Sequence, residues 1–323
     1  MAELPTRPSP WGGLARLFDT PLKRGIAILA VLLAMVVAPM VFGPYGTVIL
    51  TNALLYVVLA LGLNIVVGYA GLLDLGFAAF FAVGAYTVGI ATLTFGLNFW
   101  LALPLAIFFA ILAGIIIGGP TLRLRSDYLA IVTLGFGEIV RLTARNLRET
   151  GGATGLSGIE SPWLFGWHIS TPLDFYYVFC VLAILAVIVS VRLANSRLGR
   201  AWLYVRHDED AAEAMGINRV RVKLAAYIVG AIYGSIGGAF FAANLGAISP
   251  ESFSFRQSVL ILMAVILGGM GKIPGVILGA FIVILAPELL RDFGDLRLLL
   301  FAVGLLLIML FRPSGIWPVR SGR

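Results

Sequence analysis

The 323-residue chain is 60% hydrophobic and only 12% charged, whereas a typical soluble domain carries about 25% charged residues. Its mean hydropathy of +1.00 leaves too few polar side chains to cover a globule in water, which excludes soluble enzymes, secreted disulfide scaffolds and disordered proteins. The net charge of +7 could indicate nucleic-acid binding, but most charges flank long apolar runs, as they do in the loops of multispan membrane proteins.

No pattern of catalytic or metal-binding residues stands out in the chain. Cys180 is the only cysteine, His168 and His207 lie far apart, and HExxH is absent. Gly271-Lys272 is followed by Ile273 rather than the Ser or Thr of a nucleotide-binding Walker A loop. We therefore expect no enzyme activity, no cofactor and no metal. If the protein works against a gradient, another subunit must hydrolyse ATP.

Ten apolar segments approach the length of about 20 residues that a helix needs to cross a bilayer. The predicted spans are 26–42, 47–67, 77–95, 99–119, 128–144, 175–191, 224–243, 258–270, 275–290 and 296–311. The fifth segment is unusually polar and the eighth has only 13 residues, so eight spans is the alternative. The expected fold is an all-α polytopic membrane protein with about ten transmembrane helices.

The distribution of Lys and Arg predicts which segments face the cytoplasm. With the N-terminus inside, inside segments hold 17 of the 23 basic residues and outside segments hold 5, so both termini are expected in the cytoplasm. This gives an N-terminal tail at 1–25, a transmembrane domain at 26–311 with a long inside segment at 192–223, and a C-terminal tail at 312–323. Trp11, Leu14 and Phe18 lie at helical spacing, which predicts an interfacial helix or, equally, an ordered tail.

Gly230, Gly234 and Gly238 form a GxxxGxxxG series in the seventh predicted span. Small residues at intervals of four let membrane helices approach closely, so we expect this span to be buried at a helix crossing. Glycine is also common in membrane helices, and the alternative is that the series has no packing role.

Two glycine-dense interruptions, 68–76 and 268–275, lie within the apolar segments of the two halves of the chain. Paired interruptions are a pointer to the substrate path of a transporter, because irregular backbone at membrane depth needs protein or a water-filled cavity around it. Gly71, Asp74 and Gly269 are therefore pathway candidates. The alternative is that both are ordinary turns, with Asp74 capping the following helix.

The fifth predicted span carries polar residues, of which Thr133, Glu138 and Arg141 are further pathway candidates. Glu138 and Arg141 are three residues apart, so they share a helix face and can neutralise each other. Ionisable residues inside the membrane face the bundle interior and mark either a pathway or a structural ion pair. Both readings stay open.

A short helix is predicted within the inside segment. Asp208, Glu209 and Asp210 suit the start of a helix, Ala211 and Ala212 follow, and Gly216 is placed to end it. Such a helix, with a small-residue face, can dock into a groove of another protein. The alternative is a connecting loop that happens to be helical.

The run Asp210-Ala-Ala-x-x-x-Gly216 resembles the EAA loop of ABC-importer permeases, through which those subunits engage their ATPase partners. The spacing from the acidic residue to the glycine matches, with Asp in place of Glu. The isoleucine and Leu-Pro pair of the later motif are missing. The resemblance implies that Glu209, Asp210, Ala211, Ala212 and Gly216 couple the chain to an ATPase.

Other stretches resemble the branched-chain amino acid importer permeases of the LivM type. They are residues 122–141, the glycines at 151, 152 and 155 with Ser157-Gly158, residues 249–255 and residues 267–271, within a resemblance from about Thr51 to Pro313. The family implies a ten-span, type II importer bundle in the bacterial inner membrane. It also implies a LivH-like permease, two ATP-binding cassette subunits and a periplasmic or surface binding protein as partners, with inward transport by alternating access.

The first interruption departs from the family pattern. After Gly71 many relatives carry Gln, then Ser and a His or Gln, where this chain has Leu72, Asp74 and Phe77. Related permeases for urea and short amides share much of the pattern, so they are the alternative substrate class. A channel that needs no ATPase is the second alternative, and it would make the helix at 209–216 dispensable.

Overall fold

The computed structural model describes residues 21–121, 126–164, 166–294, 296–312 and 315–317. The predicted interfacial helix around Trp11, Leu14 and Phe18 lies outside the described residues, as does most of the C-terminal tail. The chain divides into two compact units, Met1–Thr47 and Val48–Arg323.

Helix α2 (Pro21–Leu63) begins in the first unit and is interrupted at Gly43, whose φ of 66° and ψ of −175° are not helical. Pro44 follows and has no N–H to continue the helix ladder. The Thr47 hydroxyl donates to the Gly43 carbonyl at 2.8 Å, so one backbone group near the interruption is satisfied by a side chain. The interruption falls between the first two predicted spans, 26–42 and 47–67.

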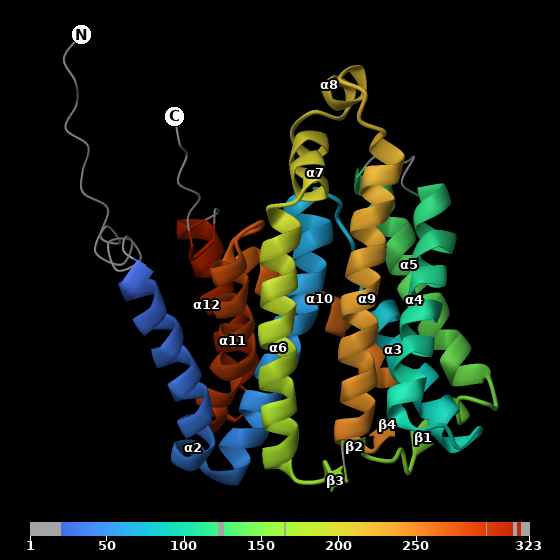
Figure 1. Cartoon of the computed structure of the whole chain (residues 1–323), viewed down its shortest axis with the longest axis vertical. Helices are drawn as coiled ribbons and strands as arrows, with labels where there is room; N and C mark the ends of the chain where they lie inside the picture. Colours follow the sequence, from blue (N-terminus) through green and yellow to red (C-terminus); the bar gives the residue numbers. More distant parts are fainter. Residues whose placement is uncertain (1–20, 122–125, 165, 295, 313–314, 318–323) are drawn as a thin grey trace. The chain divides into compact units, whose positions relative to one another are not determined.

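The second unit is mostly helical (Figure 1). After α2 come the π-helix η1 (Asn64–Tyr69), α3 (Ala78–Leu93), α4 (Phe99–Thr121), α5 (Ser126–Asn146), α6 (Pro172–Ala194), α7 (Arg197–His207), α8 (Glu209–Ala214), α9 (Arg219–Leu245), α10 (Phe255–Gly268), α11 (Ile273–Leu289) and α12 (Leu296–Phe311). Every predicted apolar segment is thus helical over most of its length.

Helix α4 shows how the unit meets its surroundings. Ala102, Ala106 and Ala110, spaced four apart, are fully buried, whereas Leu101 and Phe108 are exposed. Small residues face the protein and large apolar residues face outward, which suits lipid and not water. The chain is therefore a helical, multi-pass membrane protein.

Length and composition make five described helical stretches candidate membrane spans. They are Leu33–Tyr69, Phe99–Thr121, Pro172–Ala194, Arg219–Leu245 and Pro250–Gly268, and shorter apolar helices cover Ala78–Leu93, Ile273–Leu289 and Leu299–Ile308. Helix α5 is not in either group. The ten-span topology therefore stays a prediction.

Helices α3 and α9 cross at very short range through the glycine series. A Cβ atom on Gly238 would overlap the Phe81 carbonyl of α3, and one on Gly234 would lie 2.9 Å from Phe80 Cβ. The approach is reciprocal, because a Cβ on Gly84 of α3 would overlap the Ser235 carbonyl of α9. Gly230 faces Val66 of η1 in the same way, at 2.6 Å. This crossing places α9 directly beside the first glycine interruption.

The two ends of the second unit differ. Helices α7 and α8 lie at one end, and the short strands lie at the other (Figure 1). There β1 (Leu156–Ser157) pairs antiparallel with β4 (Ala247–Ile248), and β2 (Trp163–Leu164) pairs with β3 (Trp167–His168). The 310 turns η2 (Gly152–Thr154), η3 (Pro250–Phe253) and η4 (Arg291–Phe293) complete the connections.

Candidate functional site

The two glycine interruptions lie against each other. The first begins at the end of η1, and the second joins α10 to α11, with Gly269 at a φ of 107° and Gly271 at 82°. The Gly271 N–H donates to the Asn64 Oδ1 atom at 2.8 Å, across 207 positions of sequence. Protein groups thus satisfy irregular backbone in the interior of the unit, as a membrane protein requires.

Asp74 and Thr133 bring the first interruption to α5. The Thr133 hydroxyl accepts from the Leu75 N–H at 3.1 Å and donates to the Ala130 carbonyl at 3.1 Å. Fully buried Asp74 accepts from the Gly76 N–H through Oδ1 at 2.8 Å. A Cβ on Gly76 would overlap the Thr133 carbonyl, so α5 is in direct backbone contact with the interruption.

Asp74 does not cap the next helix. The N-cap of α3 is Phe77, and it has no side-chain cap bond. Gly71 has a φ of 72°, and a Cβ there would lie 2.8 Å from Arg206 Cγ of α7. The first interruption therefore contacts three elements that are distant in sequence: α5, α7 and the second interruption.

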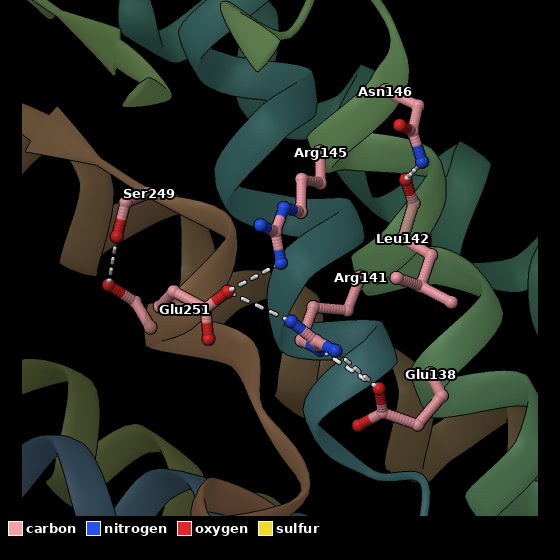
Figure 2. A network of polar contacts seen from close by, with 8 residues as sticks. Glu138, Arg141, Leu142, Arg145, Asn146, Ser249 and Glu251 are labelled. Carbon is pink, nitrogen blue, oxygen red and sulfur yellow. Dashed lines mark hydrogen bonds and ion pairs between the residues drawn. The ribbon is translucent and has the colours of Figure 1, made fainter. Parts of the chain in front are cut away.

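Arg141 of α5 lies between two carboxylates (Figure 2). Its Nε donates to Glu138 Oε2 at 2.9 Å, and its Nη1 donates to Glu251 Oε1 at 2.9 Å. Arg145 approaches the same Glu251 oxygen at 3.8 Å. The Arg141 side chain is 16% exposed and that of Glu251 is 63% exposed, so the network runs from the protein outward. It ties α5 to η3, directly after β4.

The short helix predicted between Asp208 and Gly216 is present as α8. Asp208 is its N-cap, and one carboxylate oxygen accepts from the N–H groups of Asp210 and Ala211 at 3.0 Å. Gly216 follows the helix with a φ of 84°, and its N–H donates to the Glu213 carbonyl at 2.9 Å. Glycine adopts this left-handed backbone without a steric cost, which explains why the helix ends here.

Ion pairs hold α8 to the first turns of α9. Lys223 Nζ lies 2.6 Å from Glu209 Oε1, while Arg219 lies 3.4 Å from Asp210 Oδ1 and 3.2 Å from Glu213 Oε2. Ala212 lies on the buried side of α8, whereas Ala211 and Gly216 are exposed. The exposed surface of α8 is thus its acidic and small-residue side, on a base fixed by α9.

A family model described as "Branched-chain amino acid transport system / permease component" matches residues 45–311. The match covers most of the chain, including both interruptions, the α5 network and α8. The chain belongs to this permease family.

Curated relatives agree with the family assignment. The chain is 40% identical over 321 residues to the branched-chain amino acid transport permease LivM of Salmonella typhimurium, with 92% of this chain and 76% of the relative covered. The LivM protein of Escherichia coli shows the same identity and coverage. The LivH permease of Escherichia coli is 30% identical over 155 residues, covering 47% of this chain and 49% of LivH. No solved structure matches the chain.

These likenesses confirm the LivM-type resemblance that the sequence motifs indicated. The chain is a permease subunit of a transport system and not an enzyme. Within the described part of the chain, no three His, Cys, Asp or Glu side chains come together in a way that could hold a metal. The pathway, coupling and packing roles of individual residues remain predictions.

The structure adds residues that sequence reasoning missed: Asn64, Arg206, Lys223 and Glu251. Each contacts a residue that is distant in sequence or belongs to another element, so no rule of residue spacing could have paired them. Glu251 did carry a signal, because it lies in the Ser249 to Phe255 stretch that resembles the family. Lys223 carried one too, as the last basic residue before an apolar span.

Proposed function

We propose that the chain is the permease subunit of an ATP-driven importer that moves branched-chain amino acids across the bacterial inner membrane. The 40% identity to LivM over 92% of the chain carries this proposal. LivM and LivH are both named as permeases of a branched-chain amino acid system in Escherichia coli, which supports pairing this chain with a LivH-like subunit. Two ATPase subunits and a substrate-binding protein complete the importer.

In this proposal the chain has ten spans in a type II importer bundle, with both termini in the cytoplasm. The concentration of basic residues in 192–223 supports an inside location for the α7–α8 end. The β-strand end, where Arg145 and Glu251 lie, then faces the binding protein. The docking element for an ATPase subunit is helix α8 with Gly216, which follows it; its proposed coupling residues are Glu209, Asp210, Ala211, Ala212 and Gly216.

The proposed translocation path runs along α5 and the two interruptions. Helix α5 exposes Tyr128, Ile131 and Ile139 while it carries the Glu138–Arg141 pair. Ionisable groups at membrane depth avoid lipid and face a bundle interior or a water-filled cavity. The exposed face of α5 is therefore expected to meet the path and the LivH-like subunit. Thr133, Asp74, Gly71 and Gly269 lie at or next to the interruptions that α5 contacts.

The substrate class is tested by competition. Cells without their own branched-chain uptake would express the chain with its LivH-like partner, ATPases and binding protein, and would be given radiolabelled leucine. We expect excess isoleucine and valine to block uptake, and excess urea or acetamide to leave it unchanged. Loss of uptake in the presence of urea, or no leucine uptake at all, contradicts the proposed substrate.

The same cells distinguish an importer from a channel. An inactivating substitution in the ATPase subunits is expected to abolish leucine accumulation while the permease stays in the membrane. Uptake that continues down the leucine gradient without ATP hydrolysis would favour the channel.

The path is tested with Glu138→Gln, which keeps the shape of the side chain and removes its charge. We expect a changed KM or maximal rate of leucine uptake, because Glu138 is half-buried on the path face of α5. The control is Glu288→Gln in α11, since Glu288 also pairs with an arginine three residues on, Arg291, at 3.6 Å. Unchanged kinetics in Glu138→Gln would make the pair structural.

A further inference from the structure

Helix α7 is anchored in the second unit, unlike α8, which projects from it. The Trp202 side chain is fully buried, and its Nε1 donates to the Val222 carbonyl of α9 at 2.8 Å. Val205 is buried on the same face, because residues three apart on a helix are neighbours. By contrast, Asp210 of α8 is 94% exposed. Helix α7 is therefore the link between α8 and the interior of the unit.

Arg206 lies four positions after Trp202 and is itself partly exposed, but its side chain reaches both glycine interruptions. Its Nη1 donates to the Gly68 carbonyl of η1. A Cβ on Gly271 would lie 3.4 Å from the same Nη1, and a Cβ on Gly71 would lie 2.8 Å from Arg206 Cγ. One side chain thus contacts two residues of the first interruption, Gly68 and Gly71, and lies beside Gly271 in the second.

The contact is well suited to transmit a displacement. Arg206 is two positions before Asp208, the N-cap of α8, so a movement of α8 acts on it through a very short connection. A hydrogen bond from a charged donor is stronger than a neutral one. The two interruptions also touch directly, because a Cβ on Gly68 would lie 2.5 Å from the Gly271 nitrogen, and the Asn64–Gly271 hydrogen bond fastens η1 to the second interruption, so displacement of one moves the other.

Three other basic side chains of the segment, those of Arg200, Arg219 and Lys223, have local partners. Arg219 and Lys223 pair with the acidic residues of α8. Arg200 of α7 donates to the Asn195 carbonyl at 3.0 Å, within its own connection. Arg206 differs from them because its partner, Gly68, is 138 positions away and lies in the first interruption.

We propose that Arg206 is the positioning residue that passes movement of α8 to the two glycine interruptions and so makes the opening of the path depend on the ATPase. This inference rests on the proposed function. It assigns to α7, through Arg206, the step between ATPase docking at α8 and rearrangement of the path.

The test uses the complete importer in proteoliposomes, with leucine uptake and ATP hydrolysis measured together. Arg206→Ala is expected to lower leucine transported per ATP by about tenfold, the size expected for a charge-assisted hydrogen bond. ATPase subunits should still co-purify, because α8 is unchanged. Arg206→Lys, which keeps a charged donor, should restore part of the ratio. Arg200→Gln is the control on the same helix and should keep the wild-type ratio.

A double-mutant cycle tests the same contact by a second route. Gly71→Ala places a Cβ against Arg206 and should lower transport per ATP, and adding Arg206→Ala should lower it no further. Gly96→Ala is the control, because Gly96 has a similar φ of 61° but no atom within 4 Å of its added Cβ. Gly96→Ala should keep the wild-type ratio.

The outcomes separate the inference from the function on which it rests. A wild-type ratio in Arg206→Ala, or additive effects of Gly71→Ala and Arg206→Ala, would overturn the role of Arg206 and leave the importer proposal standing. ATP-independent uptake by the wild-type complex would overturn both.

Discussion

Lys223 is an ammonium group placed almost entirely inside the protein, with 3% of its side chain exposed. Its partner Glu209 is 45% exposed and begins α8, so one partner of the ion pair is buried and the other is in contact with solvent. The two partners are consequently not equivalent. Removal of the carboxylate leaves a buried charge unpaired, whereas removal of the ammonium leaves a carboxylate that water can solvate.

The asymmetry predicts unequal effects of two substitutions. Glu209→Ala is expected to lower the free energy of unfolding by about 1 to 3 kcal/mol, because the Lys223 ammonium is left without its partner. Lys223→Met, whose side chain fills a similar space without a charge, is expected to lower the free energy of unfolding by less than Glu209→Ala does. Thermal unfolding of the purified chain in detergent would measure both.

Asp210→Ala is the matched control, since Asp210 is 94% exposed and its ion pair with Arg219 is 3.4 Å long. Exposed pairs contribute about 0 to 1 kcal/mol, so this variant should unfold close to the wild type. A larger loss of stability in Lys223→Met than in Glu209→Ala would contradict the interpretation of the pair.

At the scale of elements, the crossing of α3 and α9 depends on the absence of side chains. Gly234 and Gly238 of α9 meet Phe80 and Phe81 of α3, and Gly84 of α3 meets Ser235. Because the lipid is as apolar as the helix surfaces, this close packing has to provide much of the association. The crossing also holds α9 against η1, so its geometry sets the position of the first interruption.

Gly238→Ala is expected to destabilise this crossing by about 1 to 3 kcal/mol, because the added Cβ would overlap the Phe81 carbonyl and backbone cannot move away as a side chain can. Thermal unfolding in detergent is the measurement. Gly304→Ala, in the middle of α12 with no atom within 4 Å of the added Cβ, is the control and should lose no stability. Equal stabilities of Gly238→Ala and Gly304→Ala would show that the crossing accommodates an added Cβ atom without strain.

The helices were largely predictable, because hydrophobic length is a local property. Segment 296–311 coincides with α12, and 99–119 differs from α4 by two residues at one end. Helix α7 was missed, although Ser196, whose hydroxyl accepts from the Gly199 N–H, and the spacing of Leu198, Trp202 and Val205 were available as signals. The basic residues of α7 lower its overall hydrophobicity, so its apolar face did not stand out in the sequence.

The site was predictable only in part, for a physical reason. The Glu138–Arg141 pair follows from a spacing of three residues on one helix. Its third member, Glu251, is 110 positions away, and the partner of Asn64 is 207 positions away. Such contacts depend on how helices pack, and small residues, which determine the packing, carry no information on which helix they meet.

At the scale of the molecule, the features to which we assign a role in transport follow one another in space from one end of the second unit to the other. Helix α8 forms one end, α7 connects it to the paired interruptions, and α5 continues from the first interruption to the Arg141–Glu251 network near the strands. A subunit that docks on α8 is therefore connected through protein contacts to the opposite end. Gly216, at the outer edge of α8, is the position where docking can be tested with least disturbance to the chain itself.

Gly216 has a φ of 84° and no atom within 4 Å of an added Cβ. Gly216→Ala and Gly216→Leu therefore carry the same backbone strain, of about 1 kcal/mol, and should unfold at the same temperature. They differ only in bulk, which a docked ATPase subunit would meet and the isolated chain would not. We expect Gly216→Leu to reduce ATPase co-purification and leucine uptake well below the Gly216→Ala values.

Gly294→Leu, between α11 and α12, controls for a bulky residue at a left-handed glycine, because Gly294 has a φ of 56° and equally open surroundings. It should keep wild-type association and uptake, since Gly294 lies outside the 192–223 segment. Equal uptake and equal ATPase association in Gly216→Ala and Gly216→Leu would show that no partner packs closely against this edge of α8. Docking would then have to use the acidic face of the helix, through Asp210 and Glu213, with the glycine serving only to end it.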